Sequence, residues 1–367
     1  MQIGILIILF LYALLIIRYT LGWHKVQAIT NKDFTSTVSI VIAMRNEENE
    51  VERLLQNLQS QIYPTVKLEL ILVNDHSTDN TLNILYSSQL DNLQVINMPN
   101  GEFGKKNAIK KAVELASGDV ILASDADCSF NPKWVQTMAN YFTDESIKLV
   151  SGPVAYHKQK GIFSSLQALE FSSLIGSGAG AIGVNNAIFC NGANMAYRKE
   201  IFLEVNEFSI DAAVSGDDVF LLHSVKGKYP NSVVFAKEKS AIVMTDAVQS
   251  FSAFINQRKR WTSKSSGYKD YSSIYTSFLV LFTNLAFVFL FAMQFWDIKS
   301  FNLFILFYAV KFLVDLILLF PILKFFNRTD LVKWIFPFEI FYSFYIVLIV
   351  VLSFTKSFEW KGRVHNK

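Results

Sequence analysis

Hydrophobic positions along this chain are arranged in two patterns. The first consists of long apolar runs, which are residues 4–17, 275–296, 301–326 and 334–355. A helix needs about 20 residues to cross a hydrocarbon core of about 30 Å, so these runs predict membrane spans. We expect the first span, residues 1–23, to be an isolated and uncleaved anchor, because it has neither a basic start nor a small-residue cleavage site.

The second pattern lies between residues 35 and 265, where short apolar runs alternate with helical patterns. Runs rich in Val and Ile predict strands at residues 37–43, 68–73, 93–98 and 119–123, and the stretches between them predict helices at 49–61, 81–89 and 105–117. This alternation predicts an α/β domain with a mostly parallel sheet. In such sheets, ligands bind beyond the carboxyl ends of the strands.

Composition supports a membrane protein with a globular part. Of the 367 residues, 51% are hydrophobic and only 18% are charged, and 19 of the 33 Phe residues lie beyond residue 272. This excludes intrinsic disorder, collagen and a disulfide scaffold, and two cysteines fit a reducing compartment. A net charge of +3 carries no nucleic-acid signature, so we expect no nucleic-acid partner.

Charges near the apolar runs bear on topology. Basic residues follow the first span, which predicts that the globular part is cytoplasmic. Three later spans would put the basic tail outside, although its charges favour the inside, so one segment is expected to be interfacial or re-entrant. Lys311 and Asp315, four residues apart in the third run, predict either an internal ion pair or a transport or substrate role.

Acidic residues follow two of the predicted strands. Asp75 follows the second strand, and Asp125 and Asp127 follow the fourth. Residues at i and i+2 share a face of a strand, so the latter pair suits a divalent cation that substrate phosphates also bind. The alternatives are a solvated turn for the pair and a helix cap for Asp75.

Three further groups of residues are candidates for chemistry. Lys105 stands at a helix start after two glycines, where a diphosphate could bind. Asp217 and Asp218 precede an apolar helix, where they either cap it or supply a base for an acceptor hydroxyl. The sequence Gln257-Arg-Lys-Arg260-Trp261 is either a positive anchor beside the membrane or part of a site.

Taken together and in this order, these motifs resemble the membrane-bound family 2 glycosyltransferases of GT-A fold. The motifs are Ala43-Met-Arg45-Asn-Glu47, Val73-Asn-Asp75-His-Ser-Thr-Asp79, Gly104-Lys105, Asp125-Ala-Asp127, Gly192-Ala-Asn194, Gly216-Asp217-Asp218 and QxxRW at 257–261. The resemblance covers residues 38–261. It extends to members that glycosylate ceramide and other lipids and to processive synthases.

The resemblance implies a role for each motif. Ala43, Arg45, Glu47 and Asp75 would hold the nucleoside of a nucleotide-sugar, Lys105 would lie near the diphosphate, Asp125 near the ribose, and Asp127 would bind Mg²⁺ or Mn²⁺. Asp218 would be the catalytic base, with Asp217 as the adjacent acid. Gln257, Arg260 and Trp261 would line the acceptor and pyrophosphate end of the nucleotide-sugar site, and Gly192 and Asn194 would shape the pocket floor.

These inferences predict five regions: an anchor at 1–23, a cytoplasmic GT-A domain (Rossmann-like α/β) at 35–248, an interfacial QxxRW segment at 249–272, about three spans at 273–355 and a basic tail at 356–367. With one candidate base and no nucleophile pair, we expect transfer with inversion at the anomeric carbon.

We expect a metal-dependent enzyme of a bacterial inner membrane that transfers a sugar, by default from a UDP-sugar, to a membrane lipid or lipid-linked acceptor. Few spans, and a segment at 161–183 that is either a helix at the bilayer surface or a core helix, favour single addition. The alternatives are a processive polysaccharide synthase, whose channel could form in an oligomer, and a non-enzymatic scaffold or transporter subunit.

Overall fold

The computed structural model describes residues 2–29, 36–205, 217–296, 298–353, 357–360 and 363–366. Its larger sheet has the strand order β3-β2-β1-β4-β8-β6-β9. The strands are β1 (Val38–Met44), β2 (Leu68–Asn74), β3 (Leu93–Asn97), β4 (Val120–Asp125), β6 (Leu149–Ser151), β8 (Met195–Arg198) and β9 (Val233–Phe235). The first four pair in parallel, and β8 is antiparallel to both β4 and β6. The predicted mostly parallel α/β sheet is therefore confirmed.

Helices cover this sheet. The sequence predicted α2 (Val51–Gln59), α3 (Thr81–Ser87), α4 (Lys105–Leu115) and α8 (Asp217–Lys228), whereas α5 (Trp134–Asn140) and α7 (Lys199–Glu204) were not predicted. The parallel strands β1, β2 and β4 are buried along almost their whole length, which explains their continuous runs of Val, Ile and Leu. A second, small sheet joins β5 (Ser129–Phe130), β10 (Val243–Thr245) and β7 (Val154–Tyr156).

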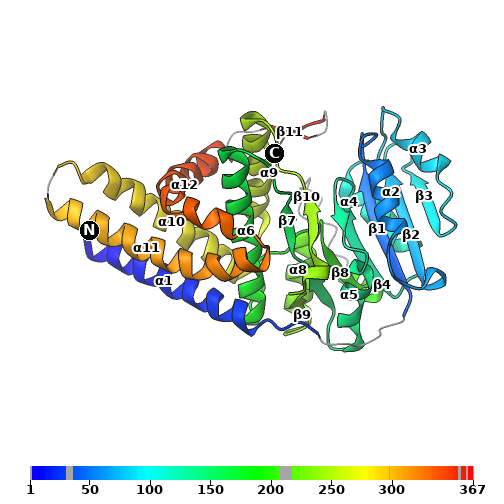
Figure 1. The fold of residues 1–367 in the computed structure, drawn as a ribbon, viewed down its shortest axis with the longest axis horizontal. Coiled ribbons are helices and arrows are strands. Elements are labelled where there is room, and N and C mark those ends of the chain that lie inside the picture. Colours follow the sequence, from blue (N-terminus) through cyan, green and yellow to red (C-terminus); the bar gives the residue numbers. More distant parts are fainter. Residues whose placement is uncertain are drawn as a thin grey trace.

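The other half of the molecule is a bundle of apolar helices (Figure 1). Four helices are long and apolar enough to cross a membrane: α1 (Gln2–Lys25), α10 (Tyr271–Met293), α11 (Ile298–Phe325) and the segment Thr329–Ser353, which contains α12 (Val332–Ser353). Helix α1 packs against α10 and α11 and against α6 (Ile162–Gly183). The expectation of an isolated N-terminal anchor is therefore wrong. Trp23, at the end of α1, is buried against Phe235 of β9 and Phe325 of α11.

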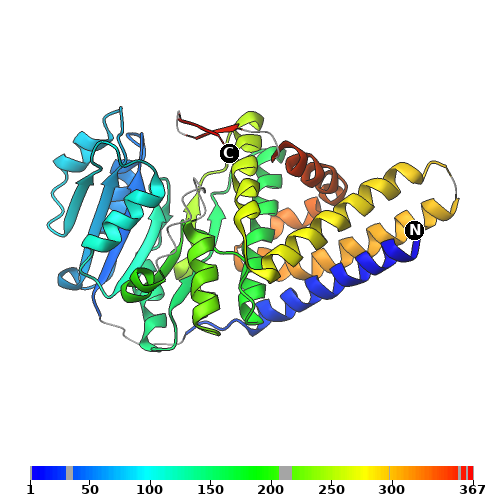
Figure 2. The same cartoon turned by 180° about the vertical axis from the view of Figure 1, so that it is seen from behind.

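Helix α6 joins the two halves. It contacts β7 and β9 on one side and α1, α11 and α12 on the other, and Figure 2 shows it between the sheet and the bundle. Within α6 only Ile162 is exposed. Of the two interpretations of residues 161–183, the core helix is therefore correct and the bilayer-surface helix is wrong.

Glycines allow α1 and α6 to pack backbone against backbone. A methyl group at Gly22 would overlap the carbonyl oxygen of Gly180, and one at Gly180 would overlap the carbonyl oxygen of Tyr19. Small residues permit this close approach between helices, where dispersion contacts replace the hydrophobic effect that lipid does not supply. The two helices therefore form the stiff connection between sheet and bundle.

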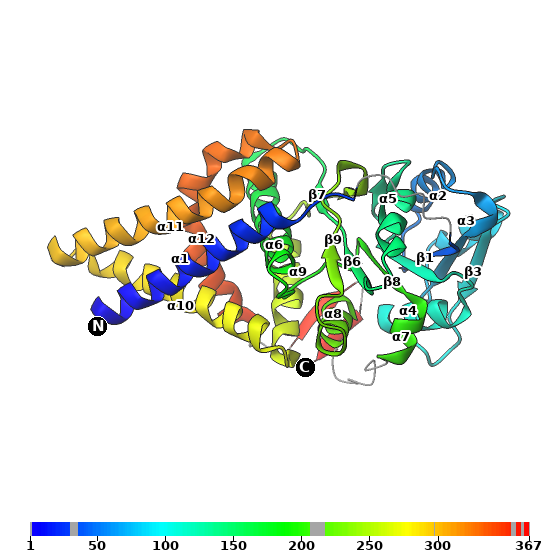
Figure 3. The ribbon, with the colours of Figure 1, turned by 90° about the horizontal axis from the view of Figure 1, so that it is seen from below.

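Helix α12 is arranged differently from the other apolar helices. Helices α10 and α11 run to the end of the bundle where the N-terminal end of α1 lies, whereas α12 crosses them obliquely and ends beside α9 (Phe251–Ser263) (Figures 1 and 3). The strand β11 (Ser357–Trp360), which pairs with β12 (Arg363–Asn366), also contacts α9. The expectation of one interfacial or re-entrant segment stays a prediction, and α12 is the apolar helix whose course differs from that of the other three. Of the basic tail residues, Lys356, Lys361 and Lys367 lie outside the described residues.

The glycine contact predicts a difference between two alanine substitutions in the same helix. Gly22→Ala should destabilise the protein by about 1–3 kcal/mol, because the added methyl group must push α1 away from α6. Gly4→Ala is the matched control, since nothing lies within 4 Å of a Cβ at that position. Thermal unfolding of both variants in detergent measures the difference, and equal melting temperatures would contradict the packing described.

Candidate active site

A cavity of about 1000 Å³ lies at the carboxyl edge of β1, β2 and β4 and continues between the apolar helices. Most of the predicted site residues line it: Ala43, Arg45, Glu47, Asp75, Lys105, Asp125, Asp127, Gly192, Asp218, Gln257, Arg260 and Trp261. These residues come from seven separate motifs, which only the fold brings together. Two predicted residues need separate comment. Asp217 is the first residue of α8, and its side chain lies outside the described part of the structure.

Asn194 lies behind the cavity wall, among the residues of the core. It is fully buried, and its Nδ2 donates to the carbonyl oxygens of Pro153 and Ala241, both at 2.8 Å. Its Oδ1 accepts a hydrogen bond from Trp134 Nε1 at 3.0 Å. All of these contacts are to protein groups, so Asn194 shapes the pocket by fixing the backbone that leads to Gly192.

Arg45 and Asp75 are held by the backbone at the ends of β1 and β2. Arg45 Nη1 donates to the carbonyl oxygens of Asp75 (2.9 Å) and His76 (2.6 Å). The buried Asp75 carboxylate accepts a hydrogen bond from the backbone N–H of Gly104 at 3.0 Å. Helix α3 takes its cap contact from Asp79, whose Oδ1 accepts from Thr81 N, so the helix-cap interpretation of Asp75 is wrong.

Asp125, the last residue of β4, and Asp127 both line the cavity, and Asp125 is paired with a lysine. Lys105 Nζ, at the start of α4, forms an ion pair with Asp125 Oδ1. Asp127 lies beside the buried Cys128, whose Sγ is 3.7 Å from Asp127 Oδ1. Burial, together with the carboxylates of Asp127 and Asp125, raises the pKa of the Cys128 thiol well above its usual value, so this cysteine remains protonated.

The chemistry of these carboxylates is that of hard oxygen ligands. Among the described residues, no group of three or more His, Cys, Asp or Glu side chains could hold a metal ion alone. A divalent cation beside Asp127 would therefore need oxygen ligands from a substrate or from water, which is how Mg²⁺ is commonly bound at phosphate sites.

Asp218 is fixed in the first turn of α8 by two backbone hydrogen bonds. Its Oδ2 accepts from the N–H of Gly192 at 3.0 Å, and its Oδ1 accepts from the N–H of Val219 at 2.9 Å. A Cβ on Gly192 would come within 3.3 Å of Asp218 Cβ, so glycine allows this close approach. The nearby Tyr268 also lines the cavity, and burial, followed by the charges of Asp218 and Cys190, raises the pKa of its hydroxyl. That hydroxyl therefore stays protonated.

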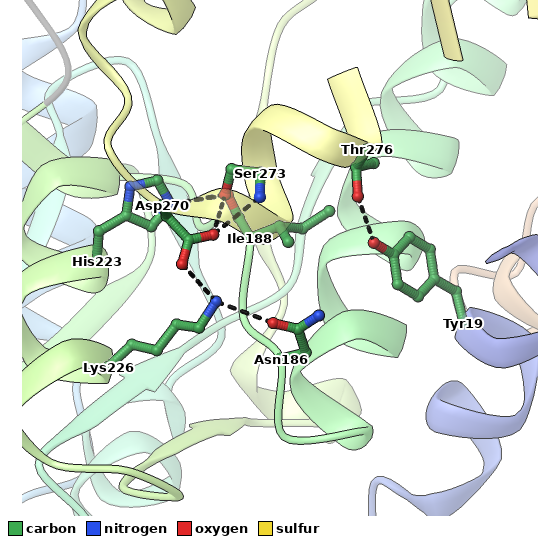
Figure 4. A network of polar contacts seen from close by, with 8 residues as sticks. All are labelled: Tyr19, Asn186, Ile188, His223, Lys226, Asp270, Ser273 and Thr276. Carbon is green, nitrogen blue, oxygen red and sulfur yellow. Dashed lines mark hydrogen bonds and ion pairs between the residues drawn. The ribbon is translucent and has the colours of Figure 1, made fainter. Parts of the chain in front are cut away.

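A polar network holds α8 against the start of α10 (Figure 4). Lys226 Nζ pairs with Asp270 Oδ2 at 2.7 Å and donates to Asn186 Oδ1 at 2.9 Å. Asp270 caps α10 by accepting from Ser273 N at 2.8 Å, and Ser273 Oγ lies 2.9 Å from His223 Nε2. Burial lowers the pKa of His223, so its imidazole is neutral near neutrality. This network ties the helix that carries Asp218 to the first helix of the C-terminal apolar region.

The QxxRW segment, part of α9, is anchored by a residue between its predicted site positions. Arg258 is 3% exposed, and its Nη2 lies 2.6 Å from Glu170 Oε2 of α6. Its guanidinium also stacks 4.4 Å from the ring of Trp261 and donates to Gln257 Oε1. Arg258 is therefore a buried, ion-paired part of the cavity wall, and the half-buried Gln257, Arg260 and Trp261 line the same cavity.

Sequence reasoning missed Arg258, Glu170 and the network around Asp270. Glu170 is the sole charged residue of α6, and a lone acid in an otherwise apolar helix was the available signal of a buried partner. Asp270 before an apolar run matched the pattern of a helix N-cap. No sequence signal indicated which basic residue would pair with Glu170.

Comparison with known proteins agrees with this geometry. Residues 39–205 match the family model described as glycosyl transferase family 2. A poly-β-1,6-N-acetyl-D-glucosamine synthase from Staphylococcus aureus is 27% identical over 202 residues, which are 53% of this chain and 47% of that protein. The glycosyltransferase AglE from Haloferax volcanii is 26% identical over 184 residues, which are 50% of this chain and 59% of that protein. The chain thus spans about half of the length of the curated relatives it matches.

A solved structure resembles the whole fold. The mannosyltransferase PcManGT from Pyrobaculum calidifontis, in complex with GDP-Man and Mn²⁺, has a TM-score of 0.58 and 15% sequence identity, covering 96% of this chain and 99% of that chain. The structural likeness confirms the predicted GT-A fold, and residues 39–205 match the glycosyl transferase family 2 model. The activity of the whole protein and the role of each site residue stay predictions.

The buried ion pair predicts a large effect for a small change at Glu170. Glu170→Gln should destabilise the protein by about 3 kcal/mol, because it leaves the buried Arg258 charge without a counter-charge. Chemical denaturation measures this effect. Glu114→Gln, at an exposed residue whose Oε1 is 4.0 Å from Lys110 Nζ, is the control and should change stability by less than about 0.5 kcal/mol. Equal effects of the two substitutions would contradict a stabilising role of the buried pair.

Proposed function

We propose that this chain, whose residues 39–205 form a family 2 glycosyltransferase domain, transfers a sugar from a nucleoside diphosphate sugar to a membrane lipid or lipid-linked acceptor. One observation carries the proposal. A single cavity extends from the carboxyl edge of the sheet into the space between the apolar helices. Asp75 and Asp127 line it at the sheet, and Asp218 of α8 lines the same cavity. A polar donor and an apolar acceptor can therefore meet in one space.

The donor end of the cavity suits a nucleoside diphosphate. Arg45 and Asp75 are fixed beside the ends of parallel strands, where nucleotides bind in open α/β sheets. Lys105 stands at the N-terminal end of α4, so its charge and the backbone N–H groups can both face a diphosphate. UDP-sugars are the default from the family resemblance, and the GDP-Man bound to the Pyrobaculum enzyme makes GDP-sugars a second class to test.

Asp218 has the placement required of a general base. Its two backbone hydrogen bonds hold the carboxylate, and Asp218 lines the cavity. The acceptor hydroxyl gives its proton to Asp218 as its oxygen forms a bond to the anomeric carbon, and the bond from that carbon to the diphosphate oxygen breaks. The nucleoside diphosphate leaves with the electron pair of that bond. A single displacement of this kind inverts the anomeric configuration.

A divalent cation fits the donor end of the cavity. Asp127, which lines the cavity, would hold Mg²⁺ or Mn²⁺ together with the diphosphate oxygens, as the family resemblance implies. When bound, the ion would offset the negative charge that develops on the leaving group. Lys105 and Arg260, which line the same cavity, add positive charge for the same purpose.

The proposed location is a bacterial inner membrane, with the sheet on the cytoplasmic side. The basic residues His24 and Lys25 at the end of α1 support this orientation, because such charges remain on the cytoplasmic side. With α12 as the interfacial or re-entrant segment, the chain after it returns to the same side as the sheet. This removes the conflict between the number of apolar segments and the basic tail.

A processive polysaccharide synthase is the second candidate. The resemblance to a Staphylococcus aureus poly-β-1,6-N-acetyl-D-glucosamine synthase favours it. A secreting synthase must enclose a polar channel within the bilayer. About half of the side chains that line the cavity between the helices are Leu, Ile, Phe or Val, and this apolar share favours a lipid acceptor over a passing polysaccharide.

Substitution of the base tests the mechanism. Asp218→Asn should lower sugar transfer by about 100-fold or more, because an amide cannot take the acceptor proton, and it should leave donor binding nearly unchanged. Asp91→Asn, at an exposed residue before the amino end of β3, is the matched control. Turnover and donor affinity are measured in parallel, and normal turnover of the Asp218 variant would remove it from the role of base.

A donor screen tests the function itself. Membranes containing the protein are incubated with radiolabelled UDP- and GDP-sugars and Mg²⁺ or Mn²⁺, and the products are partitioned between solvents. We expect label in a small product soluble in organic solvent, and its loss when EDTA removes the metal. Label in large, water-soluble material would instead establish the synthase, and no incorporation from any donor in native membranes would count against both.

A further inference from the structure

Five polar residues meet between the apolar helices, and one of them, Tyr342, lies 6.1 Å from the ring of Tyr345, whose hydroxyl bonds Glu170 of α6. Lys311 Nζ lies 2.9 Å from Asp315 Oδ2 and forms a second ion pair with Glu339 of α12. Tyr12 of α1 donates to Asp315 Oδ1 at 2.7 Å, and Lys311 lies 5.6 Å from the ring centre of Tyr342. The predicted ion pair between Lys311 and Asp315 is therefore confirmed, and it belongs to a larger group, which we call the bundle cluster.

The bundle cluster contains more hydrogen-bond acceptors than an internal ion pair requires. Lys311 and Asp315 alone would balance each other's charge, but one ammonium group faces two carboxylates here. Charged and polar side chains are costly inside a membrane, and their presence there commonly marks a functional site.

The bundle cluster faces the active-site cavity. Tyr12, Asp315, Glu339 and Tyr342 all line the same cavity as Asp218. Lys311, by contrast, is only 1% exposed and lies behind them. The carboxylate and hydroxyl groups are thus on the cavity side, and the ammonium group that holds them is on the protein side.

The cluster lies deeper in the bundle than the catalytic end of the cavity. Tyr19 of α1 bonds Thr276, in the second turn of α10, at 2.8 Å, close to the network that supports α8 (Figure 4). Tyr12 precedes Tyr19 by about two turns of the same helix, which is about 10 Å at the rise of an α-helix. Between these levels the wall is apolar and includes Leu15, Ile16 and Leu319.

We propose that the bundle cluster is a second polar subsite of the acceptor site, which binds a hydroxyl group on the hydrocarbon part of the acceptor lipid. This inference rests on the proposed function. A ligand that fills the cavity meets a polar end at Asp218, an apolar middle and a polar inner end. The matching substrate is an uncharged, mainly apolar molecule with one hydroxyl that accepts the sugar and another about 10 Å or more away. Two carboxylates at the inner end would repel a phosphate there.

The test compares a long-chain primary alcohol with the α,ω-diol of the same chain length. Thermal stabilisation of the purified protein in nanodiscs, without donor, measures binding of each compound. The diol should bind about 10-fold more tightly, because its second hydroxyl gains a hydrogen bond to a charged group. Equal affinity of alcohol and diol would overturn the subsite. This binding test involves no sugar transfer, so it is independent of the donor screen. If the diol binds more tightly but the protein incorporates no sugar from any donor, the proposed function fails and the subsite does not.

Two variants test which residues bind the second hydroxyl. Glu339→Gln and Tyr12→Phe should each reduce the ratio of diol affinity to alcohol affinity toward one, because each alters the group that faces the inner end of the cavity. Glu114→Gln, far from the bundle, should keep the ratio of the unmodified protein. Comparing diol and alcohol affinity within each variant separates a change in binding of the second hydroxyl from a change in folding. If Glu339→Gln does not fold, Tyr12→Phe still tests the assignment. A ratio that stays unchanged in both variants would overturn the assignment of these residues.

Discussion

The close packing of α6 against α1 is the contact on which the remaining architecture depends. Gly22 and Gly180 let the two backbones touch, and the opposite side of α6 packs on β7 and β9. Because one helix is shared by the sheet and the bundle, their relative position is fixed by a packed core and does not depend on a linker. A cavity that extends from one half into the other can then have a defined shape.

The same helix also positions part of the site. Glu170 of α6 pairs with Arg258, which in turn stacks on Trp261 and bonds Gln257. A buried pair of this kind contributes little net stability, since desolvation offsets the attraction. Its effect is to specify one geometry, because only one arrangement of α6 and α9 satisfies both charges. The network of Lys226, Asp270, Ser273 and His223 does the same for α8 and α10.

These constraints bear on the proposed function. The proposed donor end lies at the strand ends, where ligands bind in open α/β sheets. The proposed acceptor end is lined by residues of α1, α10, α11 and α12, which are far apart in the sequence. The charged groups of the bundle cluster are tolerated there because they satisfy one another and face a cavity, with no contact to lipid tails required.

The sequence by itself determined the elements and the chemistry at their ends. Continuous Val and Ile runs identified the parallel strands, long apolar runs identified the candidate membrane helices, and the motifs from Arg45 to Trp261 carried the resemblance to family 2 glycosyltransferases, since periodicity and short motifs are local properties of the chain. Only the tertiary structure decided that α1 is part of the bundle, that α6 is a core helix and that Asn194 lies behind the cavity wall. It also decided that Arg258 pairs with Glu170 and that Glu339 pairs with Lys311. Pairings of this kind join residues tens to hundreds of positions apart, and their partners are selected by packing in three dimensions, for which a single sequence contains no local signal.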